Sequence, residues 1–286
     1  MKIVNYSPLT IQSYLHAVED FARYFGKSPD QLNEEHMREY HLHLIRDLKL
    51  ATNTVVARIA ALRFFFVKTL RRPYVQVDLP HPKMEKRLPT VLSREEVGRL
   101  IDSASNLLHY TILLTLYATG LRRAELCNLK VADIDSQRMM IHVRQGKGKR
   151  DRDVPIPAKL LETLREYWRW MKPKTYLFPG MDNNWRVDRP LSTKSIWYIV
   201  RDAAKRVGIT KTVFPHCLRH SWATHLLESG EDLRKIQLLL GHSDLETTSV
   251  YLHLSAQHLR SVTNPIEAIP VSTVNTIKRS GRKKKE

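Results

Sequence analysis

Four short stretches of the sequence carry side chains that can bind or attack a phosphate group. The candidate site residues within them are Arg122, Glu125, Lys147, His216, Arg219, His242 and Tyr251. A guanidinium group donates to two oxygens of one phosphate, and imidazole groups can donate to the same oxygens. A tyrosine hydroxyl can attack phosphorus and remain bonded to it. Taken together, these residue types predict chemistry at a phosphodiester, with Tyr251 as the nucleophile.

Each stretch is a weak signal when it is taken alone. An arginine that follows a glycine, such as Arg122, is usually a solvated surface residue, and a lone tyrosine usually packs. The glycines beside Lys147 let the backbone approach a ligand closely, but a basic turn could also touch DNA non-specifically. The spacing of His216 and His220 would suit a metal, yet no acidic or cysteine partner lies nearby at a ligand spacing, so zinc is disfavoured. No paired carboxylates have the spacing of a two-metal nuclease.

Secondary-structure signals place the first two stretches at the ends of elements. The apolar run 110–118 predicts a buried helix that ends at Gly120, after which a new helix begins. This places the Arg122 guanidinium in a cleft beside a helix N-terminus. Residues 139–156 have the pattern of a strand, a glycine-rich turn that carries Lys147, and a second strand.

The other two stretches belong to helices. His216 and Arg219 are three residues apart and therefore share one face of a helix over 216–228. Gly241 is suited to end a helix over 232–240, and Ser243 to cap the next one. Tyr251 is then expected on a short amphipathic helix.

The remaining sequence predicts two domains. Residues 9–70 read as successive helices, one of them capped by Asn33, and the two prolines of 77–83 indicate a linker. Regular structure resumes where Ser93 and Glu96 form a capping box. The expected organisation is a helical DNA-binding domain over 1–80, a linker over 81–91, a catalytic domain over 92–277, and a basic disordered tail over 278–286.

The composition indicates what kind of partner the protein binds. The 286 residues include 47 basic and 29 acidic ones, a net charge of +18 that is spread along the chain. Such a distribution suits a protein that lies along a phosphate backbone with both domains. No apolar run is long enough to span a membrane, no secretory signal opens the sequence, and the two cysteines have neither metal nor disulfide spacing. A cytoplasmic protein with no membrane partner is expected.

The ordered motifs resemble those of the tyrosine recombinase (phage integrase) family, and their wording resembles Xer-type and mobile-element recombinases. The similarity extends from about residue 10 to residue 254. Its motifs are Gly-Leu-Arg-x-x-Glu at Arg122, Gly-Lys-Gly at Lys147, His-x-x-Arg at His216, and Leu-Gly-His at His242 with Tyr251 nine residues later. Arg123 stands where the family more often has an apolar residue, which leaves the chemistry unaffected.

The resemblance implies a mainly α fold with a small β-sheet: an N-terminal helical core-binding domain and a mixed α/β catalytic domain that clamp DNA. It also implies a mechanism. Tyr251 attacks the scissile phosphate to give a 3′-phosphotyrosyl link, while Arg122, Arg219, His216 and His242 stabilise the phosphoryl oxygens. Lys147 is the expected general acid for the leaving 5′-oxygen, and Glu125 orients neighbouring basic groups. Neither a metal nor another cofactor is expected, because the phosphotyrosyl bond conserves the energy of the broken one.

The implied reaction is site-specific recombination through a Holliday junction. The implied partners are duplex DNA target sites and further copies of the chain, as a homo-tetramer or paired dimers on synapsed DNA. A short apolar helix over 256–269 is expected to pack into a neighbouring protomer. Two alternatives share much of the motif set: a type IB topoisomerase that relaxes DNA alone, and a catalytically silent DNA-binding relative.

Overall fold

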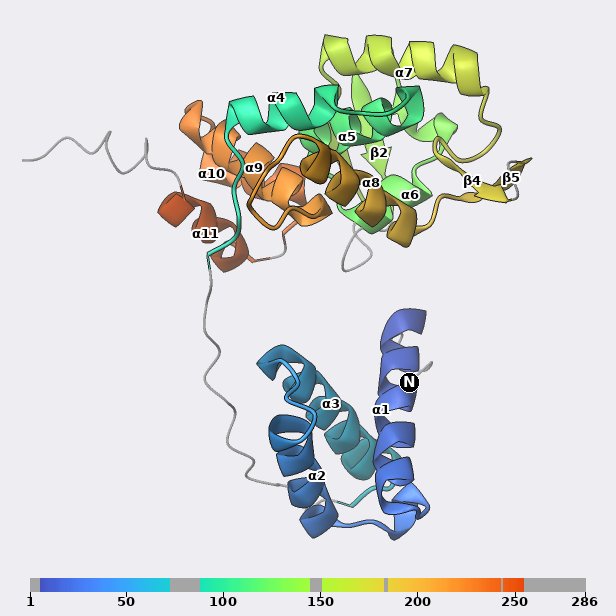
Figure 1. Cartoon of the computed structure of the whole chain (residues 1–286), viewed down its shortest axis with the longest axis vertical. Coiled ribbons are helices and arrows are strands. Elements are labelled where there is room, and N and C mark those ends of the chain that lie inside the picture. The colour runs from blue at the N-terminus through green and yellow to red at the C-terminus, as the bar shows by residue number, and fades with distance from the viewer. Residues whose placement is uncertain (1–5, 73–87, 145–150, 183–184, 243, 255–286) are drawn as a thin grey trace, which may run out of the picture. The chain divides into compact units, whose positions relative to one another are not determined.

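The computed structural model describes residues 6–72, 88–144, 151–182, 185–242 and 244–254 (Figure 1). The chain divides into two compact units, Met1–Arg87 and Leu88–Glu286. Several predicted features lie outside the described residues: the turn that carries Lys147, the N-cap Ser243, most of the linker, the helix over 256–269, and the tail over 278–286.

The N-terminal unit is helical. It contains α1 (Pro8–Phe25), α2 (Glu34–Arg46) and α3 (Thr52–Phe64), with a 3₁₀ turn at Pro29–Gln31 and a π-helical turn at Phe65–Thr69. The predicted N-cap of the second helix is confirmed, because the Asn33 side chain accepts a hydrogen bond from the backbone of His36. Phe21, Tyr40 and Phe66 are fully or almost fully buried and form the aromatic centre of its core.

The C-terminal unit is built mainly from eight helices within the described residues. They are α4 (Arg94–Asp102), α5 (Leu107–Thr119), α6 (Arg123–Asn128), α7 (Ala158–Met171), α8 (Thr193–Arg206), α9 (Pro215–Glu228), α10 (Leu233–Leu240) and α11 (Glu246–Leu254). The capping box predicted at the start of α4 is confirmed: Ser93 accepts from the backbone of Glu96, whose carboxylate accepts from the backbone of Ser93. No described helix is long and apolar enough to cross a membrane.

Two small antiparallel sheets accompany these helices. The first has the order β1 (Ile134–Asp135), β2 (Met140–Val143) and β3 (Arg152–Pro155), preceded by a 3₁₀ turn at Val131–Asp133. Its β2–β3 pair, with Ile141 opposite Val154, contains the two strands predicted within 139–156. The second sheet pairs β4 (Pro179–Asp182) with β5 (Trp185–Pro190). The strands β1, β4 and β5 were not predicted from the sequence.

Helix α9 packs against α5, α8, α10 and α11 within the C-terminal unit. Most of its residues are buried, so nearly every side of the helix faces another element. Because His216 and Arg219 belong to this helix, its packing fixes the positions of their backbone atoms. The predicted fold class, mainly α with a small β-sheet, is confirmed.

Candidate active site

A pocket of about 460 Å³ in the C-terminal unit collects most of the predicted site residues. Its lining comprises Pro89, Arg122, His216, Arg219, His220, Gly241, His242, Thr247, Val250 and Tyr251. Five of the seven predicted residues are in this set. Glu125 lies beside the pocket against Arg122, and Lys147 falls outside the described residues. Segments that are distant in sequence therefore meet at one cavity.

The position of Arg122 at this site depends on Gly120, which ends α5 in the left-handed conformation, with φ of +59°. A Cβ atom at this position would lie 2.3 Å from Cε3 of Trp222, so only glycine allows α5 to end against α9. The chain then turns so that Arg122 precedes α6 as its N-cap residue, as the sequence predicted. The helix end and the close packing together place the Arg122 side chain at the pocket.

Glu125 joins two arginines beside the pocket. Its carboxylate accepts from the backbone N–H and Nη1 of Arg122, both at 2.8 Å. The same carboxylate receives a two-pronged contact from Arg152, at 2.9 and 2.7 Å. Burial acts to raise the pKa of Glu125, but the hydrogen bonds and charge of Arg152, together with Arg122, lower it to about 2. Glu125 is therefore ionised at neutral pH and holds both guanidinium groups.

Arg152 is a site residue that the sequence analysis missed. It stands on β3, two residues before the buried Val154, and strand alternation puts these two side chains on the same face. That alternation was the available signal, but it does not identify Glu125 as the partner, 27 residues away.

Arg219 is held differently from Arg122. It is 3% exposed, and its Nη1 and Nη2 atoms donate to the backbone oxygens of Gly120 at 2.5 Å and Leu240 at 2.6 Å. Within the described ranges, no carboxylate forms an ion pair with it. Burial and then the neighbouring Arg122 lower the pKa of Arg219 to about 9, so the group remains charged at neutral pH. The pocket thus contains a positive charge that no carboxylate directly neutralises.

The C-terminal end of α10 receives all three arginines. Arg219 donates to Leu240, the Nε of Arg152 donates to Leu239 at 2.8 Å, and Arg122 donates to Gly241 at 3.4 Å. The last carbonyl groups of a helix lack intrahelical partners and carry a partial negative charge, which favours cations there. Gly241, whose φ is +64°, ends the helix as predicted. The helix end therefore anchors the guanidinium cluster.

His242 is a neutral ring with a defined tautomer. Arg219 Nη2 lies 3.2 Å from Nε2 of His242, and a guanidinium can only donate, so Nε2 must accept. The ring proton is then on Nδ1, which donates to Thr248 Oγ1 at 2.9 Å. Burial, then Arg219 and Arg122, lower the pKa of His242 to about 4.

His216 contributes an imidazole at the rim of the pocket. Its side chain is exposed, unlike that of Arg219 on the same helix. Partial burial, followed by the charges of Arg219, Arg123 and Arg122, lowers its pKa. His216 therefore presents an exposed imidazole to the pocket that Arg122 and Arg219 also line.

Tyr251 is 2% exposed and packs against Trp222 and Leu240 in a small apolar cluster. Its hydroxyl oxygen lies 3.1 Å from Nδ1 of His220. Burial raises the pKa of Tyr251, whereas Arg219 and Arg122 act to lower it. From the sequence, His220 was considered only as a metal ligand. Among the residues that the structure describes, no cluster of histidine, cysteine and acidic side chains could hold a metal ion.

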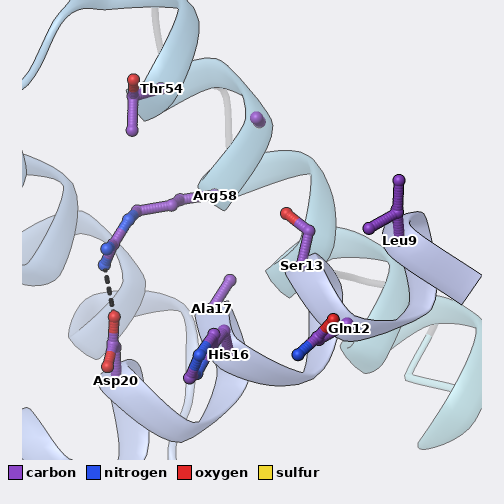
Figure 2. A pocket seen from close by; sticks show the side chains of 9 residues that line it. Leu9, Gln12, Ser13, His16, Ala17, Asp20, Thr54 and Arg58 are labelled. Atoms are coloured by element: carbon purple, nitrogen blue, oxygen red, sulfur yellow. Dashed lines mark ion pairs between the residues drawn. The ribbon is translucent and has the colours of Figure 1, made fainter. Parts of the chain in front are cut away.

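A second groove, of about 560 Å³, lies on the N-terminal unit between α1 and α3 (Figure 2). Asp20 and Arg58 meet across it at 2.9 Å, and His16 and Gln12 stand along α1 (Figure 2). Its only arginine is paired with a carboxylate, and it lacks the set of cations found around Arg219. Among the described residues, the predicted arginines and histidines therefore line the first pocket and not this groove.

Two family models match this chain. Residues 90–258 match the phage integrase family, and residues 1–76 match the phage integrase N-terminal SAM-like domain. A Sinorhizobium fredii protein named as an integrase/recombinase is 45% identical over 94% of this chain and 87% of its own length. The tyrosine recombinase XerA of Thermococcus kodakarensis is 38% identical over 89% of this chain and 88% of its own length.

Solved structures of recombinases and integrases also resemble this chain. A crystal structure of XerA recombinase is 35% identical, with a TM-score of 0.55 over 91% of this chain and 92% of that one. The integrase of the Tn1549 transposon, at 18% identity, shares the fold with a TM-score of 0.70 over 92% of this chain and 94% of that one. None of these matches favours the topoisomerase alternative. The chain belongs to the phage integrase family and is a tyrosine recombinase.

Proposed function

We propose that this recombinase exchanges DNA strands at specific sites, with Tyr251 as the nucleophile that cleaves and later rejoins each strand. The observation that carries the proposal is the convergence of Arg122, Arg219, His242 and Tyr251 on one pocket. A cavity with a buried, uncompensated guanidinium beside a tyrosine hydroxyl suits an anion that must be attacked by oxygen.

In the proposed reaction, the hydroxyl oxygen of Tyr251 attacks the scissile phosphorus. A 3′-phosphotyrosyl bond forms and the 5′-oxygen leaves. Arg122 and Arg219 donate to the non-bridging oxygens, where negative charge increases in the transition state. His216 donates from the rim. His242 donates from Nε2 once its ring proton has moved from Nδ1 to Nε2 and its contact with Arg219 is exchanged for the phosphate.

Two further residues have supporting roles in the proposal. Lys147, which lies outside the described residues, supplies the proton that the leaving 5′-oxygen needs. Glu125 does not touch DNA; its contacts with Arg122 and Arg152 support a positioning role. The phosphotyrosyl bond retains the energy of the broken phosphodiester, so rejoining needs no nucleotide cofactor.

Duplex DNA is the proposed substrate, since relatives such as the Tn1549 integrase and lambda integrase have been solved with DNA bound. The two units would then clamp the duplex, and further copies of the chain would assemble as a homo-tetramer or paired dimers on synapsed sites. Strand exchange would pass through a Holliday junction, in the cytoplasm. The excess of basic residues in both units supports binding to a polyanion.

The nucleophile is tested with Tyr251→Phe. Protein mixed with fragmented genomic DNA of its source is denatured, and covalently attached DNA is sequenced to find the cleavage site. A nicked duplex of that site then traps the adduct. We expect Tyr251→Phe to bind this duplex normally but to form no adduct, because only the attacking oxygen is lost.

Tyr117→Phe is the matched control, since Tyr117 is a half-buried tyrosine that also contacts a histidine of α9, but it does not line the pocket. It should form adduct at the normal rate. An adduct that survives denaturation in Tyr251→Phe would assign the nucleophile to another residue.

A further inference from the structure

Two histidines of helix α9 each contact the hydroxyl of a tyrosine from another helix, with similar geometry but in different surroundings. His220 Nδ1 lies 3.1 Å from the hydroxyl of Tyr251, and His225 Nδ1 lies 2.8 Å from the hydroxyl of Tyr117. Only the first pair lines the pocket of the arginines. The two residues of that pair come from α9 and α11, so tertiary packing alone brings them together.

His220 is neutral at physiological pH. Burial, and then the charges of His216 and Arg219 on the same helix, lower the pKa of His220 to about 4. Tyr251 faces it from α11, and His242 is the nearby titratable group from the turn after α10. A neutral imidazole has one nitrogen that accepts a hydrogen bond, and a phenol hydroxyl can donate to it.

We propose, on the basis of the function proposed above, that His220 is a catalytic residue whose Nδ1 takes the proton of the Tyr251 hydroxyl as that oxygen attacks phosphorus. The proton passes from the tyrosine oxygen to Nδ1 while the bond from oxygen to phosphorus forms. The bond from phosphorus to the 5′-oxygen breaks with its electron pair, and that oxygen takes a proton from Lys147. On rejoining, the His220 imidazolium returns its proton to the departing tyrosine oxygen.

The other groups of the described pocket are less suited to this role. The guanidinium groups of Arg122 and Arg219 have no acceptor atom. Both ring nitrogens of His242 are engaged, one by Arg219 and one by Thr248. His216 is exposed at the rim, and among the described contacts the Tyr251 hydroxyl meets His220 and not His216.

Substrate binding would activate this base. Burial is the main cause of the low pKa of His220, and the neighbouring charges of His216 and Arg219 lower it further. A phosphodiester bound between Arg219 and His216 would offset those charges. A nearby negative charge favours the protonated form of a histidine, so the affinity of Nδ1 for a proton rises when DNA is in place. Arg219 and Arg122 also favour the tyrosinate that results.

The test compares His220→Asn and His220→Ala with the unchanged protein in single-turnover adduct formation on the nicked duplex. The asparagine amide can accept the hydrogen bond near the position of Nδ1 but cannot hold the proton. We expect both variants to be slower by about 10²–10⁴-fold, the usual contribution of a general base. The rate of His220→Asn should also keep rising with pH, as hydroxide replaces the lost base.

His225→Asn is the matched control, because it changes the other pair on the same helix and should leave the rate and its pH dependence unchanged. DNA affinity and thermal unfolding of each variant show whether the pocket is intact. If His220→Asn reacts at the normal rate with the normal pH profile, the contact only positions the hydroxyl and the proposal is wrong. An adduct in Tyr251→Phe would instead overturn the nucleophile, whatever His220→Asn shows.

Discussion

The two arginines of the pocket arise from similar short motifs but are held by opposite means. Arg122 has a carboxylate partner, Glu125, and its side chain is 17% exposed. Arg219 is 3% exposed and donates to the carbonyl oxygens at the ends of α5 and α10. A carboxylate neutralises a guanidinium, whereas carbonyl dipoles orient it and leave its charge in place.

The difference gives the two arginines different roles. The charge of Arg219 remains available for an anion, and its carbonyl contacts tie together two helix ends. The charge of Arg122 is moderated by Glu125, which Arg152 shares. Arg219 should therefore matter for both catalysis and folding, and Arg122 mainly for catalysis.

The largest expected effect comes from replacing each arginine with alanine. Arg122→Ala and Arg219→Ala should each lower the single-turnover cleavage rate by about 10²–10³-fold, the size expected for one charge-stabilising donor. Arg219→Ala should also lower the free energy of unfolding, because two buried carbonyl oxygens lose their donor, at about 1–3 kcal/mol each. Arg122→Ala should cost less stability, since Arg152 still pairs with Glu125.

Adduct formation at saturating DNA and chemical unfolding measure the two effects separately. Equal losses of stability in the two variants would contradict the comparison. A rate loss explained fully by weaker DNA binding would show that the arginine in question binds DNA but does not stabilise the transition state.

The second prediction concerns Glu125→Gln, which keeps the shape of the side chain but removes its charge. Two arginines would then lose their shared counter-charge, and breaking a buried pair in this way costs about 3–5 kcal/mol. Chemical unfolding should show this loss. Glu231→Gln is the control, because Glu231 and Lys235 form an exposed pair worth about 0.5 kcal/mol or less. A Glu125→Gln protein as stable as the control variant would show that Glu125 is not needed to hold the arginines.

The smallest expected effect is a dependence of stability on pH. The pKa values of His220 and His242 are lowered from 6.5 to about 4, so as pH falls the unfolded chain takes up these protons first. The stability that these two neutral histidines contribute is complete above pH 6.5 and is lost as the pH falls to about 4. Glu125, with its pKa lowered from 4.5 to about 2, acts in the same direction but at lower pH.

Chemical unfolding between pH 7.5 and pH 5, followed by tryptophan fluorescence, tests this prediction. All five tryptophans lie after residue 167, so the signal reports on the C-terminal unit. The double variant His220→Asn with His242→Asn should show a flatter profile than the unchanged protein. If the free energy of unfolding changes equally steeply with pH in both proteins, other groups cause the pH dependence.

Local chemistry in the sequence determined much of this protein. The caps at Asn33 and Ser93 and the glycines that end α5 and α10 depend on neighbouring residues, so each was predictable. The motif residues were found because few residue types bind or attack phosphate. The role of Lys147 remains a prediction.

Only the tertiary structure decided which partner each group meets. Arg152 and His220 were not chosen as catalytic-site residues because their partners, Glu125 and Tyr251, are 27 and 31 residues away in the chain. The strand β1 has two residues, too few for a periodic pattern to be recognised. Hydrogen bonds between distant segments depend on how helices pack, and packing is a property of the whole core. The sequence therefore supplied the reacting groups, and the fold set their charges and contacts.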